Sequence, residues 1–279
     1  MARELTLAQK AERSIIKKYR KDIWNPFIAA VKRYQLIQEG DRIAVCISGG
    51  KDSMLMAKLM GQLRRISEVR FEVVYLVMNP GYTDANFDKL MSNAKLLEID
   101  VNVFETDIFE VADSVDNSPC YLCARMRRGH LYSKAKEMGC NKIALGHHMN
   151  DVIETTLMGM MYSSQLQAML PRLKSTNFEG MELIRPMFCI REESIISWAR
   201  YNNLDFLGCA CKFTENASKA QFESLSKRKE TKEIIASIRK LNPDVEDNIL
   251  KSLHNVHLDT FIEYKKEGTR HSFLERFED

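Results

Sequence analysis

The chain has 279 residues, a net charge of +3 at pH 7 and seven cysteines. This length buries a substantial core, in one large domain with an appendage or in two small ones. The small charge does not by itself indicate a polyanionic partner, the odd number of cysteines argues against a secreted disulfide framework, and no run of eighteen apolar residues marks a membrane span. Because the first residues lack the apolar core of a signal peptide, we expect a cytoplasmic protein without a membrane anchor.

Helices of mixed charge are expected over residues 7–38, with Pro26 opening the second of them. Strands and helices then alternate, which predicts an α/β fold with a doubly wound parallel sheet. The expected strands are 42–47, 71–77, 101–105 and 142–145, and the helices between and after them are 53–66, 84–98, 124–138 and one from about 150. Residues 183–190 are expected to form a strand or a turn, residues 192–202 a helix, and residues after about 213 a charged helical tail.

The first predicted strand is joined to its helix by a glycine-rich loop with the sequence Ser48-Gly49-Gly50-Lys51-Asp52-Ser53. Glycines let backbone N–H groups approach a ligand, and the start of a helix favours negative charge. Lys51 adds a cation, and the two serines add hydroxyls. Asp52 tolerates a neighbouring phosphate only if Mg²⁺ lies between them. The loop is too short for a Walker A motif, yet it predicts a nucleotide site in preference to a simple helix-capping turn.

The fourth predicted strand is followed by a second polar segment, Gly146-His147-His148-Met149-Asn150-Asp151. The carboxyl end of a strand in an open α/β sheet is where ligands bind. We place Gly146 and His147 at the nucleotide and expect Asp151 to share Mg²⁺ with Asp52. Asn150 belongs either to this site or to a helix cap. Adjacent histidines point in different directions, so one metal is not expected to bind both.

Cys120 and Cys123 form a CxxC pair after the third predicted strand. The pair is compatible with a redox dithiol, with a zinc site completed by Cys209 and Cys211, or with an iron–sulfur cluster that has a third ligand further along. A redox pair would follow the first strand of its βαβ unit, and CxC is a poor second half for a zinc ribbon. Spacing alone leaves zinc and the cluster equally weighted. The other cysteines are interpreted as small core residues: Cys46, Cys140 and Cys189.

Taken together, SGGKDS, PCYLCARMRRG and GHHMND resemble the tRNA 2-thiocytidine synthetase family, a branch of the pyrophosphate-loop (N-type) ATP pyrophosphatases. The similarity extends from about Leu36 to about Asn216. It implies an adenine nucleotide alpha hydrolase-like fold with ATP, Mg²⁺ and a [4Fe-4S] cluster. From the order of the expected elements we predict three segments, namely an N-terminal helical segment (1–40), the ATPase domain with its CxxC (41–207) and a C-terminal helical segment (208–279).

In this family three cysteines hold the cluster and leave one iron free for sulfur. By resemblance, Cys120 and Cys123 are the first two ligands. Counting back from Asn216 selects Cys211 as the third, with Cys209 as the alternative. The chain departs from the family pattern in two places, where relatives have a CxxC and two consecutive acids and this chain has Cys209-Ala210-Cys211 and Asn150-Asp151.

The resemblance implies that AMP is transferred from ATP to the C2 oxygen of an anticodon-loop cytidine, and that sulfur then displaces AMP. Lys51, Asp52, Asp151 and the three cysteines are the expected catalytic residues. Some relatives acting on uridine carry extra zinc-binding cysteine pairs, which this sequence lacks, so cytidine is the expected base. The expected partners are tRNA, a sulfur donor (a cysteine desulfurase or free sulfide) and a second copy in a homodimer. The alternative is a cluster-free ligase, similar to lysidine synthetase, with a structural zinc.

Two segments carry the positive charge that binding to a phosphate backbone requires. Residues 120–142 contain six basic residues and one acid, and residues 212–242 contain eight basic residues and four acids. For the tail, a solvated helical face is an equally good interpretation. Arg125, Arg127 and Arg128 are the stronger candidates for a tRNA surface, because they lie beside the predicted cluster.

Overall fold

The computed structural model describes the backbone of residues 4–108, 119–208 and 219–277, and the side chains of these ranges except 119–124 and 219–226. The chain divides into two compact units, residues 1–231 and residues 232–279. The three segments expected from the sequence remain a prediction.

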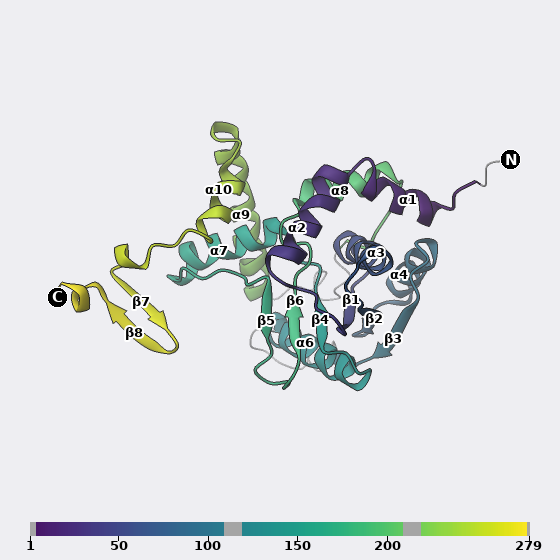
Figure 1. Ribbon diagram of the computed structural model, residues 1–279, viewed down its shortest axis with the longest axis horizontal. Helices are drawn as coiled ribbons and strands as arrows, with labels where there is room; N and C mark the ends of the chain where they lie inside the picture. The colour runs from purple at the N-terminus through teal and green to yellow at the C-terminus, as the bar shows by residue number, and fades with distance from the viewer. Residues whose placement is uncertain (1–3, 109–118, 209–218, 278–279) are drawn as a thin grey trace. The chain divides into compact units, whose positions relative to one another are not determined.

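The first unit is built on a six-stranded sheet with the order β3-β2-β1-β4-β6-β5 (Figure 1). Its strands are β1 (Arg42–Ile47), β2 (Glu72–Asn79), β3 (Val101–Glu105), β4 (Lys142–Ala144), β5 (Arg172–Lys174) and β6 (Glu182–Ile184). All neighbouring strands are parallel except β5 and β6. From β1 the chain builds outward to β3 on one side and resumes with β4 on the other. The strand order therefore switches between β1 and β4, where open α/β sheets bind their ligands.

Helices cover both faces of this sheet, as predicted for a doubly wound fold. Up to residue 208, the helices of this unit are α1 (Leu7–Ile16), α2 (Asn25–Arg33), α3 (Lys51–Ile66), α4 (Asp84–Leu96), α6 (Pro119–Glu137), α7 (Met149–Ser163) and α8 (Glu192–Tyr201), with a π-helical turn η1 (Arg20–Trp24). Successive residues of β1 face opposite sides. Ile43 and Val45 join the core under α1, α3 and α8, whereas Ala44 and Cys46 join the core under α6.

The helix boundaries follow the expected local signals. Thr6 starts α1 with a capping box in which its hydroxyl accepts from the N–H of Gln9 and the Gln9 side chain accepts from the N–H of Thr6. Pro26 lies at the start of α2, as predicted. The α6 helix starts at Pro119, earlier than the expected residue 124, so the CxxC lies inside the helix. Strand β5 was not predicted, because three residues carry too little alternation to mark a strand.

The second unit contains the end of α9 (Lys219–Leu241), α10 (Val245–Ser252), the short helices η3 (Leu258–Thr260) and η4 (Phe273–Arg276), and a hairpin of β7 (Glu263–Lys266) with β8 (Thr269–Ser272). The tail is thus helical in α9 and α10 but ends in a hairpin that was not predicted. Its turn uses Glu267 and Gly268, both at positive φ. A charged Glu-Gly turn lacks the usual Asn-Gly or Asp-Gly signal. Across the described residues, no helix is both long and apolar enough to span a membrane.

Candidate active site

The glycine-rich loop leaves β1 at the switch point and enters α3 at Lys51. Gly50 is the residue before the helix, and no described side chain caps it, so the first N–H groups of α3 are available to an anion. Gly49 has a φ of +86°, and a Cβ there would lie 2.7 Å from Cδ1 of Leu207. Both the backbone conformation and the space therefore require glycine at position 49.

The serines of the loop hold its shape. The Ser53 hydroxyl accepts from the N–H of Ser48 at 3.2 Å and donates to the carbonyl of Gly50 at 3.0 Å. Ser53 is buried, whereas Ser48 is exposed. The loop borders a cavity of about 470 Å³ whose other wall comes from α8 and the residues after it, including Leu204, Phe206 and Leu207. This volume is within the range of small-ligand sites.

Lys51 lies between two carboxylates. Its Nζ is 3.1 Å from Oδ2 of Asp52 and 3.1 Å from Oε1 of Glu192, the first residue of α8. Burial alone would lower the pKa of Lys51, but the two carboxylates raise it above its ordinary value. Lys51 is therefore a cation at neutral pH. The sequence placed Glu192 only in a helix and gave no indication that it belongs to the site.

His148 lies at the centre of the carboxylate group. Its Nε2 is 3.8 Å from Oδ1 of Asp52 and 4.0 Å from Oε1 of Glu192, and its Nδ1 is 3.5 Å from Oδ2 of Asp151. The side chain is buried. The sequence feature that could have identified His148 as a site residue is its position immediately before α7, where the polar segment after β4 ends and the helix begins.

His147 faces a different group. Its Nδ1 accepts from Nε of Arg185 at 3.3 Å. Burial, assisted by the Arg185 charge, lowers the pKa of His147 to about 4, so its imidazole is neutral at pH 7. The expectation that His147 contacts the nucleotide remains a prediction.

The segment after β4 packs directly on the start of α3. A Cβ at Gly146 would lie 3.3 Å from the carbonyl carbon of Asp52 and 3.3 Å from the nitrogen of Ser53. Asp151 accepts from the backbone N–H of His148 at 3.0 Å and so closes the first turn of α7. Asn150 accepts from the N–H of Glu192 at 2.9 Å, so it caps α8 and not its own helix.

The donors around this loop fit a magnesium ion that is bound together with a nucleotide. In the described part of the chain, Oδ1 of Asp52 is buried and has no hydrogen-bond partner. A buried carboxylate oxygen of this kind favours a cation. The described residues contain no group of three or more His, Cys, Asp or Glu side chains that could hold a metal alone. Mg²⁺ usually takes one or two carboxylates plus phosphates and water, so Asp52 and Asp151 are sufficient candidates.

Comparison with known proteins identifies the group to which this site belongs. Residues 16–220 match the family model of the PP-loop domain. The chain is 37% identical over 243 residues to the tRNA-cytidine(32) 2-sulfurtransferase of Geobacter metallireducens, covering 86% of this chain and 91% of that protein. It is 35% identical over 239 residues to the protein of the same name from Geobacter sulfurreducens, covering 85% and 90%. The chain belongs to the tRNA-cytidine(32) 2-sulfurtransferase family of PP-loop proteins.

The fold is also found in a solved structure, the U34-tRNA thiolase NcsA from Methanococcus maripaludis with its [4Fe-4S] cluster. The match has a TM-score of 0.66 at 20% identity and covers 88% of this chain and 79% of that one. The expected family and the adenine nucleotide alpha hydrolase-like fold are therefore confirmed.

The cysteines expected to bind the family's cluster lie at the ends of the described ranges or outside them. Cys120 and Cys123 lie in the first two turns of α6, three residues apart. Their side chains, and Cys209 and Cys211 entirely, lie outside the described residues. Cluster ligation by these residues stays a prediction.

Two other cysteines lie in the core, as interpreted from the sequence. Cys46 and Cys140 are buried, and burial raises the pKa of both thiols, that of Cys46 to about 12. Cys189 is only partly buried, and its thiol lies beside Tyr34. These thiols are protonated at neutral pH and are therefore poor metal ligands.

The basic surface expected over residues 120–142 needs one correction. On α6, Arg125 and Arg128 are exposed, and Arg127 donates to the hydroxyl of Tyr82 at 3.3 Å. Lys142 was counted with them but is buried, with its Nζ 2.6 Å from Oδ2 of Asp41. It contributes no charge to the surface.

In the tail, the exposed Arg228 lies beside two carboxylates of α7. Its Nη1 lies 3.5 Å from Oδ1 of Asp151, and its Nε lies 3.7 Å from Oε2 of Glu154. Arg228 is thus solvated and also paired with the acids of α7, and the role of the tail in tRNA binding stays a prediction.

Proposed function

We propose that this protein is a tRNA sulfurtransferase that uses ATP to replace the C2 oxygen of an anticodon-loop cytidine with sulfur. The observation that carries the proposal is the SGGKDS loop at the switch point, where Lys51, Asp52, Glu192, His148 and Asp151 surround one small region beside a ligand-sized cavity. Relatives of this chain over most of its length are named for this reaction. Sulfur transfer is therefore favoured over the cluster-free ligase.

In the first step the C2 oxygen of the base attacks the α-phosphate of ATP, and the bond to pyrophosphate breaks. Lys51 and the N–H groups at the start of α3 stabilise the charge that develops on pyrophosphate. Asp52 and Asp151 are the residues that would hold Mg²⁺, which neutralises phosphate charge when bound. Ser48, Gly49, Gly50 and Ser53 keep the loop open to the phosphates.

In the second step sulfur attacks C2, and the C–O bond to AMP breaks. A [4Fe-4S] cluster held by Cys120, Cys123 and Cys211, or by Cys209 in place of Cys211, would present that sulfur on its fourth iron. The sulfur donor in this proposal is free sulfide, or a cysteine desulfurase whose persulfide is reduced to sulfide by a thiol, which supplies the two electrons. The proposal also includes a homodimer in the cytoplasm.

The proposal is tested by mixing the protein, purified without oxygen, with ATP, Mg²⁺, tRNA and sulfide. We expect AMP and pyrophosphate in equal amounts, released only when tRNA is present, because adenylation of the base requires both substrates. Release of ADP and phosphate, or AMP formation that does not depend on tRNA, would contradict the proposed chemistry.

Substitutions of Asp151 and Asn150, in the first turn of α7, distinguish a role in catalysis from a role in stability. Asp151→Asn keeps an acceptor for the His148 N–H but removes the charge, so we expect kcat to fall by a factor of about 10² or more with little change in Tm. Asn150→Ala removes the hydrogen bond to the Glu192 N–H and costs about 1 kcal/mol of stability, with kcat reduced less than about tenfold. Equal losses of kcat would mean that this segment acts only through helix capping.

A further inference from the structure

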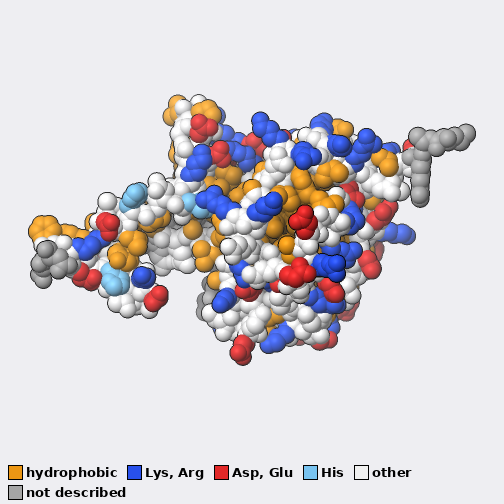
Figure 2. All heavy atoms as spheres, in the orientation of Figure 1, with side chains coloured by type: hydrophobic (Ala, Val, Ile, Leu, Met, Phe, Trp, Pro, Cys, Tyr) orange, Lys and Arg blue, Asp and Glu red, His pale blue; other side chains and the backbone are white. Residues whose placement is uncertain are grey.

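The first helix carries a basic surface that counting charges along the sequence did not reveal. Residues 7–38 contain eight basic residues and two acids, and four of the basic side chains are exposed on or just after α1, namely Lys10, Arg13, Lys17 and Lys18. Glu12, the acidic residue of α1, points away from these cations. Its carboxylate pairs with Arg65 and lies 3.8 Å from Nζ of Lys58. Lysine and arginine side chains accordingly gather over α1, α2 and α8 in the space-filling view (Figure 2).

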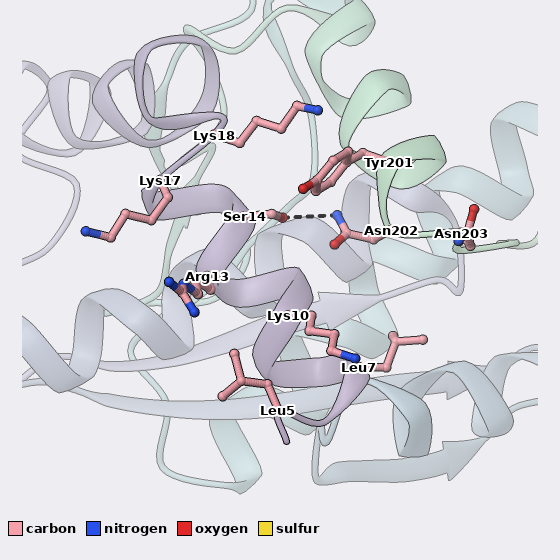
Figure 3. Close-up of a pocket in the computed structure, with 10 residues that line it drawn as sticks. All are labelled: Leu5, Leu7, Lys10, Arg13, Ser14, Lys17, Lys18, Tyr201, Asn202 and Asn203. Atoms are coloured by element: carbon pink, nitrogen blue, oxygen red, sulfur yellow. Dashed lines mark hydrogen bonds between the residues drawn. The ribbon is translucent and has the colours of Figure 1, made fainter. Parts of the chain in front are cut away.

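These four side chains border a groove of about 720 Å³ between α1 and the end of α8 (Figure 3). Its other lining residues are Leu5, Leu7, Ser14, Tyr201, Asn202 and Asn203, so none of the described residues that line it is acidic. Lys10 lies 3.8 Å from the exposed Glu4, a pair that solvent screens. The groove therefore presents a positive surface to a ligand.

The walls of the groove are held in place by contacts between the two helices. The amide of Asn202 donates to the hydroxyl of Ser14 at 3.0 Å, a bond drawn in Figure 3. The indole N–H of Trp198 donates to the carbonyl of Ala11 at 3.2 Å. Nζ of Lys18 lies 3.6 Å from the ring centroid of Tyr201, a cation–π contact that fixes the position of the charge. Walls that are already ordered lower the entropic cost of binding.

The same helix connects this groove to the active site. The α8 helix begins at Glu192, which contacts Lys51, and ends at Tyr201, which lines the groove. Ten residues of α-helix span about 15 Å. Arg200, the neighbour of Tyr201, lines the cavity beside the glycine-rich loop. One extended polyanion can therefore reach both places.

We propose that the α1–α8 groove binds the phosphate backbone of the substrate tRNA outside the reacting nucleotide. The ten residues of α1 span about 15 Å, and an RNA strand presents several phosphates over such a length. A row of cations suits a strand better than a single free phosphate. This inference rests on the proposed function, because it takes tRNA as the occupant.

The test compares two fourfold variants with equal loss of charge. The groove variant is Lys10→Gln, Arg13→Gln, Lys17→Gln and Lys18→Gln. The control replaces four other exposed basic residues by glutamine, namely Arg64, Arg70, Lys95 and Lys174. Binding of fluorescent tRNA is measured by anisotropy over a range of salt concentrations. We expect the groove variant to bind at least roughly tenfold more weakly than the control, with the slope of log Kd against log salt reduced by about 3.

The outcomes distinguish a failure of the groove inference from a failure of the proposed function. If wild-type protein binds and thiolates tRNA but the groove variant keeps the affinity and salt slope of the control, the groove inference is wrong and the proposed function stands. If wild-type protein does not bind tRNA, the proposed function fails and the groove loses its occupant. Unchanged tRNA binding with sulfur transfer lost only from a protein donor would assign the groove to an acidic protein instead. Lys17→Gln/Lys18→Gln is the milder variant should the fourfold variant unfold, with a slope reduced by about 1.5.

Discussion

Asp52→Ala is expected to abolish AMP and pyrophosphate formation, with kcat reduced by a factor of about 10³ or more. The substitution removes the carboxylate that lies 3.1 Å from Lys51 and that is placed to hold Mg²⁺ on the phosphates. It lies in the first turn of α3, where alanine is a good helix former, so the fold and the cluster should be retained. The measurement is tRNA-dependent release of AMP and pyrophosphate, together with circular dichroism.

The matched control is Asp100→Ala, which removes an exposed acid outside the site and should leave kcat unchanged. If Asp52→Ala turns over ATP at the wild-type rate, the loop is not the nucleotide site. If Asp52→Ala is inactive because the protein unfolds, Asp52→Asn tests the role of the charge. This variant keeps the size of the side chain and loses only the charge.

Loss of any one cluster cysteine is expected to remove both iron and thiolation. Protein purified without oxygen should be brown and contain about four irons with labile sulfide, whereas Cys120→Ala and Cys123→Ala should be colourless. A [4Fe-4S] core with two protein thiolates in place of three has too few anchors. Visible absorption and metal analysis measure this directly. A colourless wild-type protein that contains zinc would support the ligase alternative and contradict the cluster.

The buried cysteines supply the controls. Cys46→Ala and Cys140→Ala remove core sulfur atoms at a cost of about 1 kcal/mol and should keep the spectrum, as should Cys189→Ser. Cys209 and Cys211 decide the third ligand, because only one of two residues in a CxC needs to bind. If Cys209→Ala removes the cluster and Cys211→Ala preserves it, Cys209 is the third ligand and the chemistry stands. If metal persists in these variants and in Cys120→Ala, the three-cysteine site does not exist.

The glycine-rich loop was predictable because its signals are local. Strand, glycines, lysine and helix follow one another within residues 42–66, so the sequence contains the whole anion site. The same holds for Gly146 and Asp151, since parallel strands bring their carboxyl ends together. Cys46 was recognisable as a core residue from its place inside the first predicted strand, and Cys140 from its place at a helix–strand turn.

Contacts between distant segments were not predictable in this way. Glu192 reaches Lys51 across 141 positions, and Arg228 reaches Asp151 from the charged tail. Neither has a motif that marks it. Counting charges also misplaced Lys142, which is buried against Asp41. Counting charges also failed to reveal the basic face of α1, because the direction in which Glu12 points depends on packing and not on composition.

The central claim is tested most directly by mass spectrometry of tRNA nucleosides from cells that lack this protein. The account predicts that 2-thiocytidine disappears from the tRNA, returns with the wild-type gene, and stays absent with Asp52→Ala or Cys120→Ala. Unchanged 2-thiocytidine in the deletion strain, or its full restoration by the Asp52→Ala variant, would contradict ATP-dependent thiolation by this chain.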